Sequence, residues 1–369
     1  MTDRRPRARE LGIRIGLLPT GRNNAITDVE GVRVGHTTLV HGHGPLRRGE
    51  GPVRTGVTVV VPPGDERDAV YAGTHTLNGN GEMTGLEWIR HSGMLTTPIG
   101  LTNTHSVGVV RDAIVAAGAR NRPEQELYWA LPVVAETWDG LLNDINGQHV
   151  RREHLFAALD AAAGGPVAEG NVGGGTGMVC HEFKGGIGTA SRIIDPGAGG
   201  YVVGALVQAN HGRRERLTVA GKPVGQLIPR TEVPSPYARL RPPPEAGSGS
   251  IIVILATDAP LLPHQCRALA ERAGLGVARV GGAGERSSGD IFLCFATGNQ
   301  LTNPEAETQV RHVRTVADRA LSELFWAAVE ATEEAIVNAL VAAETMQGCN
   351  DVVAHALPAD ALTALADGA

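Results

Sequence analysis

The chain has 369 residues, of which 42% are hydrophobic and 20% are charged, and its formal net charge is −6 at pH 7. This composition is typical of a globular enzyme with a large core, and the charge disfavours a nucleic-acid partner. Neither a secretory signal nor a membrane span is expected, because the first residues lack an apolar stretch and no run of about 18 apolar residues occurs.

Five segments are predicted to be strands because their apolar residues alternate or run continuously: 31–40, 56–64, 200–210, 250–257 and 290–297. Apolar residues at helical spacing predict four helices: 105–120, 152–165, 262–276 with Gly274 near its end, and 316–346 as one long helix or two consecutive ones. Strands and helices mixed in this way favour an α/β or α+β sandwich.

The cysteines are widely spaced and form no CxxC pair: Cys180, Cys266, Cys294 and Cys349. They are predicted to be small buried side chains and reduced thiols of a cytoplasmic protein. Two histidines of the turn 41–44 lack a third ligand nearby, so no metal site is expected there.

A glycine-rich segment at 170–191 suggests phosphate binding, with Lys184 as a partner for the phosphate. The segment contains neither a P-loop spacing nor a strand–GxGxxG–helix unit, so the favoured interpretation is structural. Its glycines are expected to let the backbone pass close to an active site or to a partner subunit.

Residues 213–247 are polar and rich in proline, and they are predicted to form a surface linker. The linker ends in Gly249–Ser250, directly before the apolar strand, and the prolines are expected to keep this junction accessible. Ser250 is then either an ordinary loop residue or the new N-terminus left by cleavage of the Gly249–Ser250 bond. The freed α-amine, with a pKa of about 7.7–8.0, would be a suitable base near neutral pH. No GxSxG or SxxK serine motif is present.

Several motifs occur in order along the chain: NNAITDVEGVRVGHTT, LNGNGEMTGLEWI, TPIGLTNTHSVGVV, PVVAET, EGNVGGGTGMVC, GSIIVILATDAPL and SGDIFLCFAT. Together they resemble the L-aminopeptidase/D-Ala-esterase-amidase family, which includes the β-peptidyl aminopeptidases. The resemblance runs from about residue 11 to residue 358.

The resemblance implies a four-layer αββα sandwich, similar to N-terminal-nucleophile hydrolases but with different connectivity. It also implies self-cleavage between Gly249 and Ser250 into an α chain, 1–249, and a β chain, 250–369, which together form one composite domain. The processed pairs are expected to assemble as a homotetramer.

Individual roles follow from the same resemblance. Ser250 is the expected nucleophile, Ser288 and Asp290 assist it, and Asn210 supplies an oxyanion-hole amide. Glu136 is expected to bind the free amine of the substrate, and Trp138 replaces a tyrosine that is implied to help bind the oxyanion in some members.

The expected activity is that of a serine aminopeptidase acting on small peptides, amides or esters through an acyl-enzyme, with no metal and no organic cofactor. Whether the substrates are L-α, D or β residues is left open. Two alternatives remain: an autoprocessing acyltransferase of the ornithine acetyltransferase type, and an uncleaved binding protein with a decayed site. Asn78 and Asn103 are further candidates for lining the cleft, without an assigned chemical role.

Overall fold

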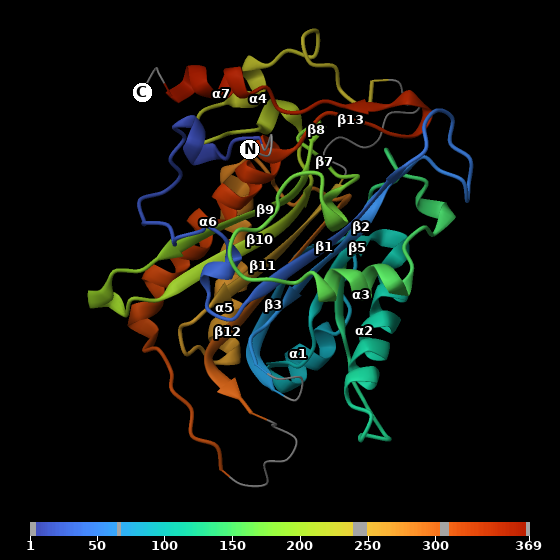
Figure 1. Cartoon of the computed structure of the whole chain (residues 1–369). Helices are drawn as coiled ribbons and strands as arrows, with labels where there is room; N and C mark the ends of the chain where they lie inside the picture. The colour runs from blue at the N-terminus through green and yellow to red at the C-terminus, as the bar shows by residue number, and fades with distance from the viewer. Residues whose placement is uncertain (1–4, 65–67, 239–248, 303–309, 367–369) are drawn as a thin grey trace.

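The computed structural model describes residues 5–64, 68–238, 249–302 and 310–366. Two β-sheets lie face to face between two layers of helices (Figure 1). The six-stranded sheet has the order β4-β3-β12-β11-β10-β9 and the four-stranded sheet the order β1-β2-β5-β6. This arrangement confirms the predicted αββα sandwich.

The strands of the six-stranded sheet are β3 (Ala69–Gly79), β4 (Met94–Leu95), β9 (Gly186–Ile193), β10 (Val202–Asn210), β11 (Gly249–Thr257) and β12 (Ser288–Leu301). The four-stranded sheet contains β1 (Arg33–His41), β2 (Val53–Val61), β5 (Ile99–Asn103) and β6 (Val133–Thr137). Two short hairpins pair β7 (Val179–Cys180) with β8 (Phe183–Lys184), and β13 (Met346–Gln347) with β14 (Val353–Ala354).

The helices are α1 (Leu86–Ser92), α2 (Val107–Asn121), α3 (Arg152–Asp160), α4 (Val224–Leu227), α5 (Pro263–Arg279), α6 (Leu321–Ala342) and α7 (Ala359–Ala366). Helices α5 and α6 cover the outer face of the six-stranded sheet, and α2 and α3 cover the outer face of the four-stranded sheet (Figure 1).

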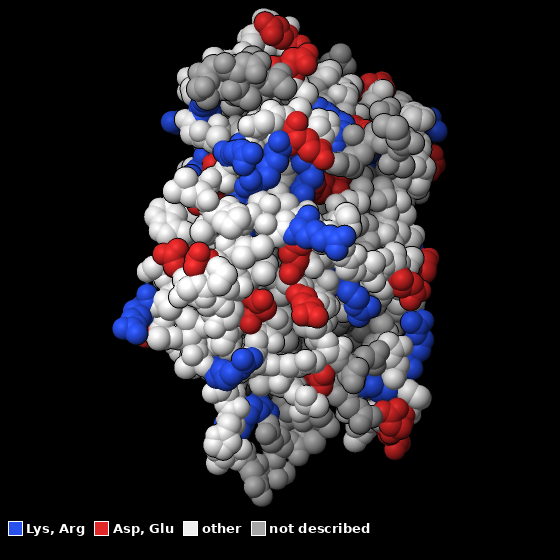
Figure 2. All heavy atoms as spheres, turned by 60° about the vertical axis from the view of Figure 1, so that its left-hand side comes forward, with Lys and Arg blue, Asp and Glu red and all other residues white. Residues whose placement is uncertain are grey.

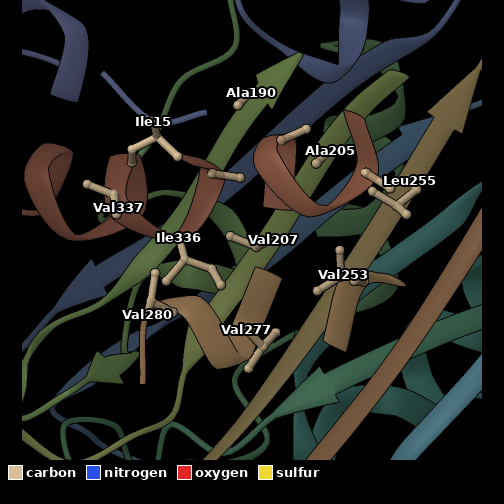
Figure 3. Packing of buried hydrophobic residues seen from close by; sticks show 14 of the residues in the cluster. Ile15, Ala190, Ala205, Val207, Val253, Leu255, Val277, Val280, Ile336 and Val337 are labelled. Carbon is tan, nitrogen blue, oxygen red and sulfur yellow. The ribbon is translucent and has the colours of Figure 1, made fainter. Parts of the chain in front are cut away.

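Strand β11 is apolar on both faces because both faces are covered. Ile251, Val253 and Leu255 point toward α5 and α6, within the cluster that Figure 3 shows. Ile252 and Ile254 point the other way, into the core between the two sheets. Side chains alternate across a strand, so a central strand in a four-layer fold needs an unbroken apolar run.

The expected strands and helices are present, and several differ in extent: the helix predicted at 152–165 ends at Asp160, and the strand predicted at 290–297 runs from Ser288 to Leu301. The last predicted helix is a single helix, α6, and α5 continues through Gly274 to Arg279. A Cβ at Gly276 would lie 2.6 Å from the Cβ of Thr332 on α6, so this glycine permits close helix packing and does not end the helix.

The predicted surface linker 213–247 is wrong for its first part. Arg214, Leu217, Val224 and Ile228 are buried, and the last three belong to the core beside α5 and α6. The guanidinium of Arg214 lies over the ring of Phe183. This basic side chain, which contributed to the predicted polar linker, therefore packs in the interior. Residues 239–248 lie outside the described part of the chain. The prediction that this segment keeps the Gly249–Ser250 junction accessible therefore stays a prediction.

Acidic and basic side chains are interspersed on the face that Figure 2 shows, where neither sign forms a continuous patch.

The contact between α6 and β9 depends on Gly188, because a Cβ there would lie 2.0 Å from the carbonyl oxygen of Ala335. We expect Gly188→Ala to destabilise the fold by about 1–3 kcal/mol, since the helix must move to admit the methyl group. Gly108→Ala, at an exposed α2 position with open space around it, should instead stabilise by about 0.5–1 kcal/mol. Thermal unfolding of the two variants and the wild type checks this, and equal midpoints for the two variants would contradict it.

Candidate active site

Ser250 is the second residue of β11 and is held between two neighbouring strands. Its partner in antiparallel β10 is Asn210, and its partner in parallel β12 is Gly289. Only 5% of Ser250 is exposed. The register of three central strands therefore fixes where this hydroxyl lies.

Gly249 precedes Ser250 in a conformation that favours glycine, with φ at +144°. A Cβ there would lie 1.9 Å from the carbonyl oxygen of Asn210. The peptide bond before Ser250 is thus pressed against β10, and no larger residue than glycine fits without movement of the backbone.

Ser288 and Asp290 open the neighbouring strand β12. The Ser288 hydroxyl donates to Oδ1 of Asp290 at 2.6 Å, as expected for two side chains on one face of a strand. Oγ of Ser250 accepts the backbone N–H of Gly289 at 3.1 Å. Ser288 and Ser250 form no direct hydrogen bond among the described residues, because the register sets Ser288 opposite Gly249.

The carboxyl group of Asp290 is almost fully buried. Burial raises its pKa to about 6, while hydrogen bonds from the Ser288 hydroxyl and the Ile251 backbone partly oppose this, and the nearby Glu285 adds to it. A carboxyl with such a pKa changes protonation close to neutral pH and can take up or release a proton there.

Both ends of the Asn210 side chain are fixed. Nδ2 donates to the carbonyl oxygen of Trp138 at 3.0 Å, and Oδ1 accepts the N–H of Val179 at 2.7 Å. An amide NH₂ carries two hydrogens, so one N–H is left for a ligand beside Ser250. A spare N–H next to a hydroxyl nucleophile is the kind of group that can act as an oxyanion-hole donor.

Glu136, on β6 of the other sheet, is 3% exposed. Oε1 accepts the N–H of Glu82 at 2.9 Å, and Oε2 accepts the hydroxyl of Thr104. Burial raises the pKa of Glu136, although both hydrogen bonds and the nearby His105 oppose the shift. A buried carboxylate with few partners favours a cation beside it.

One cavity of about 590 Å³ joins these groups. Its lining residues come from both sheets, from the loops beside them and from the segment that ends at residue 238. They are Asn80, Gly81, Glu82, Thr104, Glu136, Trp138, Leu141, Gly177, Val179, Asn210, Tyr237, Gly249, Ser250 and Ser287. The structure thus brings together Ser250, Asn210, Glu136 and Trp138, with Ser288 and Asp290 behind Ser250.

Several residues of the cavity are missing from the sequence prediction. Thr104 and Glu82 contact Glu136, and Tyr237 lines the wall although it lies in the predicted linker. The sequence could have indicated Thr104, because it follows Asn103 in the motif TPIGLTNTHSVGVV. Tyr237 has no local signal, since long-range packing brings it there.

Asn78 and Asn103 do not line the cavity, and both support it. Nδ2 of Asn78 donates to the carbonyl oxygen of Ser288 at 2.6 Å, and Nδ2 of Asn103 donates to the Thr55 hydroxyl at 2.7 Å. Asn78 thus fixes the start of β12, and Asn103 fixes the end of β5 to β2, beside the cavity.

The glycine-rich segment is used for close packing. Gly177 lines the cavity, and a Cβ at Gly174 would lie 2.1 Å from the side-chain oxygen of Gln208. Lys184 is fully buried, and its ammonium donates to the carbonyl oxygens of Gly185 at 2.8 Å and Gly175 at 3.3 Å. That environment does not suit a phosphate.

Comparison with known proteins assigns the chain to a peptidase family. The model of peptidase family S58 matches residues 24–354. The chain belongs to this family.

Relatives in the family share most of the chain. A protein named beta-peptidyl aminopeptidase BapA from Sphingosinicella microcystinivorans is 51% identical over 366 residues, which cover 98% of this chain and 91% of the relative. A solved Burkholderia sp. beta-aminopeptidase is 54% identical with a TM-score of 0.89, covering 98% of this chain and 99% of that one.

A third solved structure, l-aminopeptidase d-ala-esterase/amidase from Ochrobactrum anthropi, is 44% identical with a TM-score of 0.88, over 98% of each chain. That structure is described as a new variant of the Ntn hydrolase fold, and the similarity confirms the predicted family and fold class for this chain. None of the described helices is long and apolar enough to cross a membrane.

The raised pKa of Asp290 has a consequence for stability. Because the folded chain holds this proton more tightly than the unfolded chain, whose carboxyl has a pKa of about 3.9, stability falls as pH rises toward 6. We expect Asp290→Asn to remove this loss. The difference in free energy of unfolding, variant minus wild type, should therefore increase by about 2 kcal/mol from pH 4.5 to pH 7.5.

Denaturant unfolding at the two pH values, in a Ser250→Ala background that keeps the chain intact, measures this difference. Asp112→Asn, at an exposed position on α2, controls for the loss of one negative charge. An Asp290→Asn difference that is the same at both pH values would contradict the assignment.

Proposed function

We propose that this member of peptidase family S58 is a self-processing serine aminopeptidase. The observation that carries the proposal is that Ser250 and the buried carboxyl of Glu136 line the same cavity. A nucleophile and an anion in one closed site suit a substrate whose acyl group reacts while its free N-terminal amine is bound. The names of the aminopeptidase relatives support this activity.

The first reaction is the cleavage of the chain itself. Oγ of Ser250 attacks the carbonyl carbon of Gly249, and the Gly249–Ser250 amide becomes an ester with a free α-amine on Ser250. Water then hydrolyses the ester, which leaves a carboxylate on Gly249 and the hydroxyl on Ser250. The conformation of Gly249, pressed against the Asn210 carbonyl, supports this step by storing strain at the bond that breaks.

In the second reaction the same hydroxyl attacks the acyl carbon of a bound substrate. The new α-amine of Ser250 takes the hydroxyl proton and passes it to the leaving group. The spare N–H of Asn210 stabilises the oxyanion, and water releases the acyl group from Ser250. Asp290 holds Ser288 in one orientation beside the new terminus, so that this pair helps to place or exchange the proton.

The cavity also limits the substrate. A volume of about 590 Å³ suits a small ligand, so we propose short peptides, amides or esters with a free amine. Because the named relatives include beta-peptidyl aminopeptidases, we include short β-peptides among them. Trp138 is 46% exposed and presents a large flat wall to this substrate; its backbone, and not its ring, positions Asn210.

We further propose that the processed chains, 1–249 and 250–369, stay together as one composite domain and assemble as a homotetramer. In the six-stranded sheet, β11 and β12 of the second chain lie side by side between β10 and β3 of the first chain, which supports a domain that survives the cut. Four free, buried cysteine thiols support a reducing, cytoplasmic location.

Intact mass and N-terminal sequencing of purified protein test the cleavage. The wild type should give two chains, the second beginning at Ser250, and Ser250→Ala should stay full-length and lack amidase activity. Ser322→Ala, on the exposed side of α6, should be cleaved like the wild type. A wild type that stays uncut and inactive would contradict the proposal and favour an uncleaved binding protein.

Removing the oxyanion donor tests the role of Asn210. We expect Asn210→Ala to lower kcat about 10²- to 10³-fold with a smaller effect on KM, because the hydrogen bond strengthens only as the oxyanion forms. Steady-state kinetics on a chromogenic aminoacyl amide measure this, on protein that has first been shown to be cleaved. A change confined to KM would show that Asn210 only binds substrate.

Neutralising Glu136 tests amine recognition. We expect Glu136→Gln to lower kcat/KM about 10- to 100-fold for substrates with a free amine, because one charge-assisted contact is lost. Glu87→Gln, at an exposed position on α1, is the matched control and should leave kcat/KM unchanged. If an ester without a free amine loses as much activity as the amine substrate, Glu136 does not recognise the amine.

A further inference from the structure

Three metal-binding side chains gather directly behind the cavity floor. Cys180 ends β7, His181 follows it in the turn to β8, and His211 follows the last residue of β10. The backbone N–H of His181 donates to the carbonyl oxygen of His211 at 2.7 Å, so the two segments are fixed to each other. The residues before them, Val179 and Asn210, line the cavity.

The three side chains lie at distances that suit a shared ion. One ligand atom from each lies within 4.8 Å of the others. Sγ of Cys180 is 3.7 Å from Nδ1 of His211, and the ring centroids of His181 and His211 are 5.1 Å apart. Around a tetrahedral zinc ion with bonds of 2.0–2.3 Å, ligand atoms are separated by about 3.3–3.7 Å.

A buried ring nitrogen of His181 lacks a partner without such an ion. His181 is 0% exposed, and its Nε2 atom has no hydrogen-bond partner among the described residues, while His211 would bind the ion through Nδ1, the atom near Sγ of Cys180. Nδ1 of His181 lies 2.9 Å from the carbonyl oxygen of Arg213, which can only accept. Nδ1 therefore carries the hydrogen, and the lone pair of Nε2 is left exposed to the cluster. A backbone carbonyl on the far nitrogen is the usual support of a metal-bound histidine.

Neutral imidazole and thiolate are the forms in which histidine and cysteine bind zinc. A bound cation would replace the thiol proton, which passes to solvent as the metal–sulfur bond forms.

We propose that Cys180, His181 and His211 bind one thiophilic divalent cation of the zinc type, with water in the fourth position. The ion would tie the β7–β8 hairpin to the end of β10 and so fix the segment that holds Asn210. It would not touch the reacting atoms at Ser250, so the aminopeptidase reaction described above needs no metal. This site goes beyond the sequence prediction, in which Cys180 is only a buried thiol.

Metal content of the full chain tests the site. Protein produced in zinc-supplemented medium is passed over a chelating resin and analysed by plasma mass spectrometry. We expect one equivalent of zinc per chain in the wild type and in Cys349→Ser, a substitution of another buried cysteine. Cys180→Ser and His211→Asn should each lose at least about 90% of it, since a three-residue site does not survive loss of one ligand.

Cobalt substitution of the wild type gives a second readout that does not depend on the folding of a variant. We expect a thiolate-to-cobalt charge-transfer band in the near ultraviolet, together with the intense visible bands of four-coordinate cobalt. Wild-type protein without zinc and without this band would overturn the proposal. Zinc retained in full by folded Cys180→Ser would also overturn it, because the ion would then lie elsewhere.

Discussion

The chemistry of this chain depends on the pairing of three central strands. Antiparallel β10 and parallel β12 flank β11, and this register sets Asn210 and Gly289 on either side of Ser250. The strand cannot slide, because a shift by one residue would turn its alternating apolar side chains into the wrong core on both faces. Burial of β11 therefore fixes the position of the Ser250 hydroxyl.

The same burial sets the electrostatics of the site. The carboxyl groups of Glu136 and Asp290 lie in surroundings that disfavour their charge, and the pKa of each is raised. In the proposed reaction, a bound ammonium group would offset the unfavourable buried charge of Glu136, so burial of this carboxyl would favour recognition of the substrate amine. The proton of Asp290 stays exchangeable near neutral pH, close to Ser250, the proposed new N-terminus.

The sequence predicts those features that rest on local pattern. The continuous apolar run after Ser250 predicts a central strand, and the ordered motifs lead to the family, the four layers and the grouping of Ser250, Asn210 and Glu136. It does not predict contacts that only the folded chain creates. Tyr237 and Arg214 stand in a polar, proline-rich segment, and long-range packing alone buries Arg214 and brings Tyr237 into the cavity wall. Gly276 resembles a helix end, but its role is set by α6, which lies more than 40 residues further along the chain.

The central claim is that Ser250 is both the new N-terminus and the acylated nucleophile. Acid quenching during turnover of a slow ester substrate, followed by peptide mapping by mass spectrometry, tests both parts at once. The account predicts the acyl mass on the hydroxyl of a peptide that begins at Ser250. An acyl group on Ser288, or on a peptide in which Gly249 is still joined to Ser250, would contradict it.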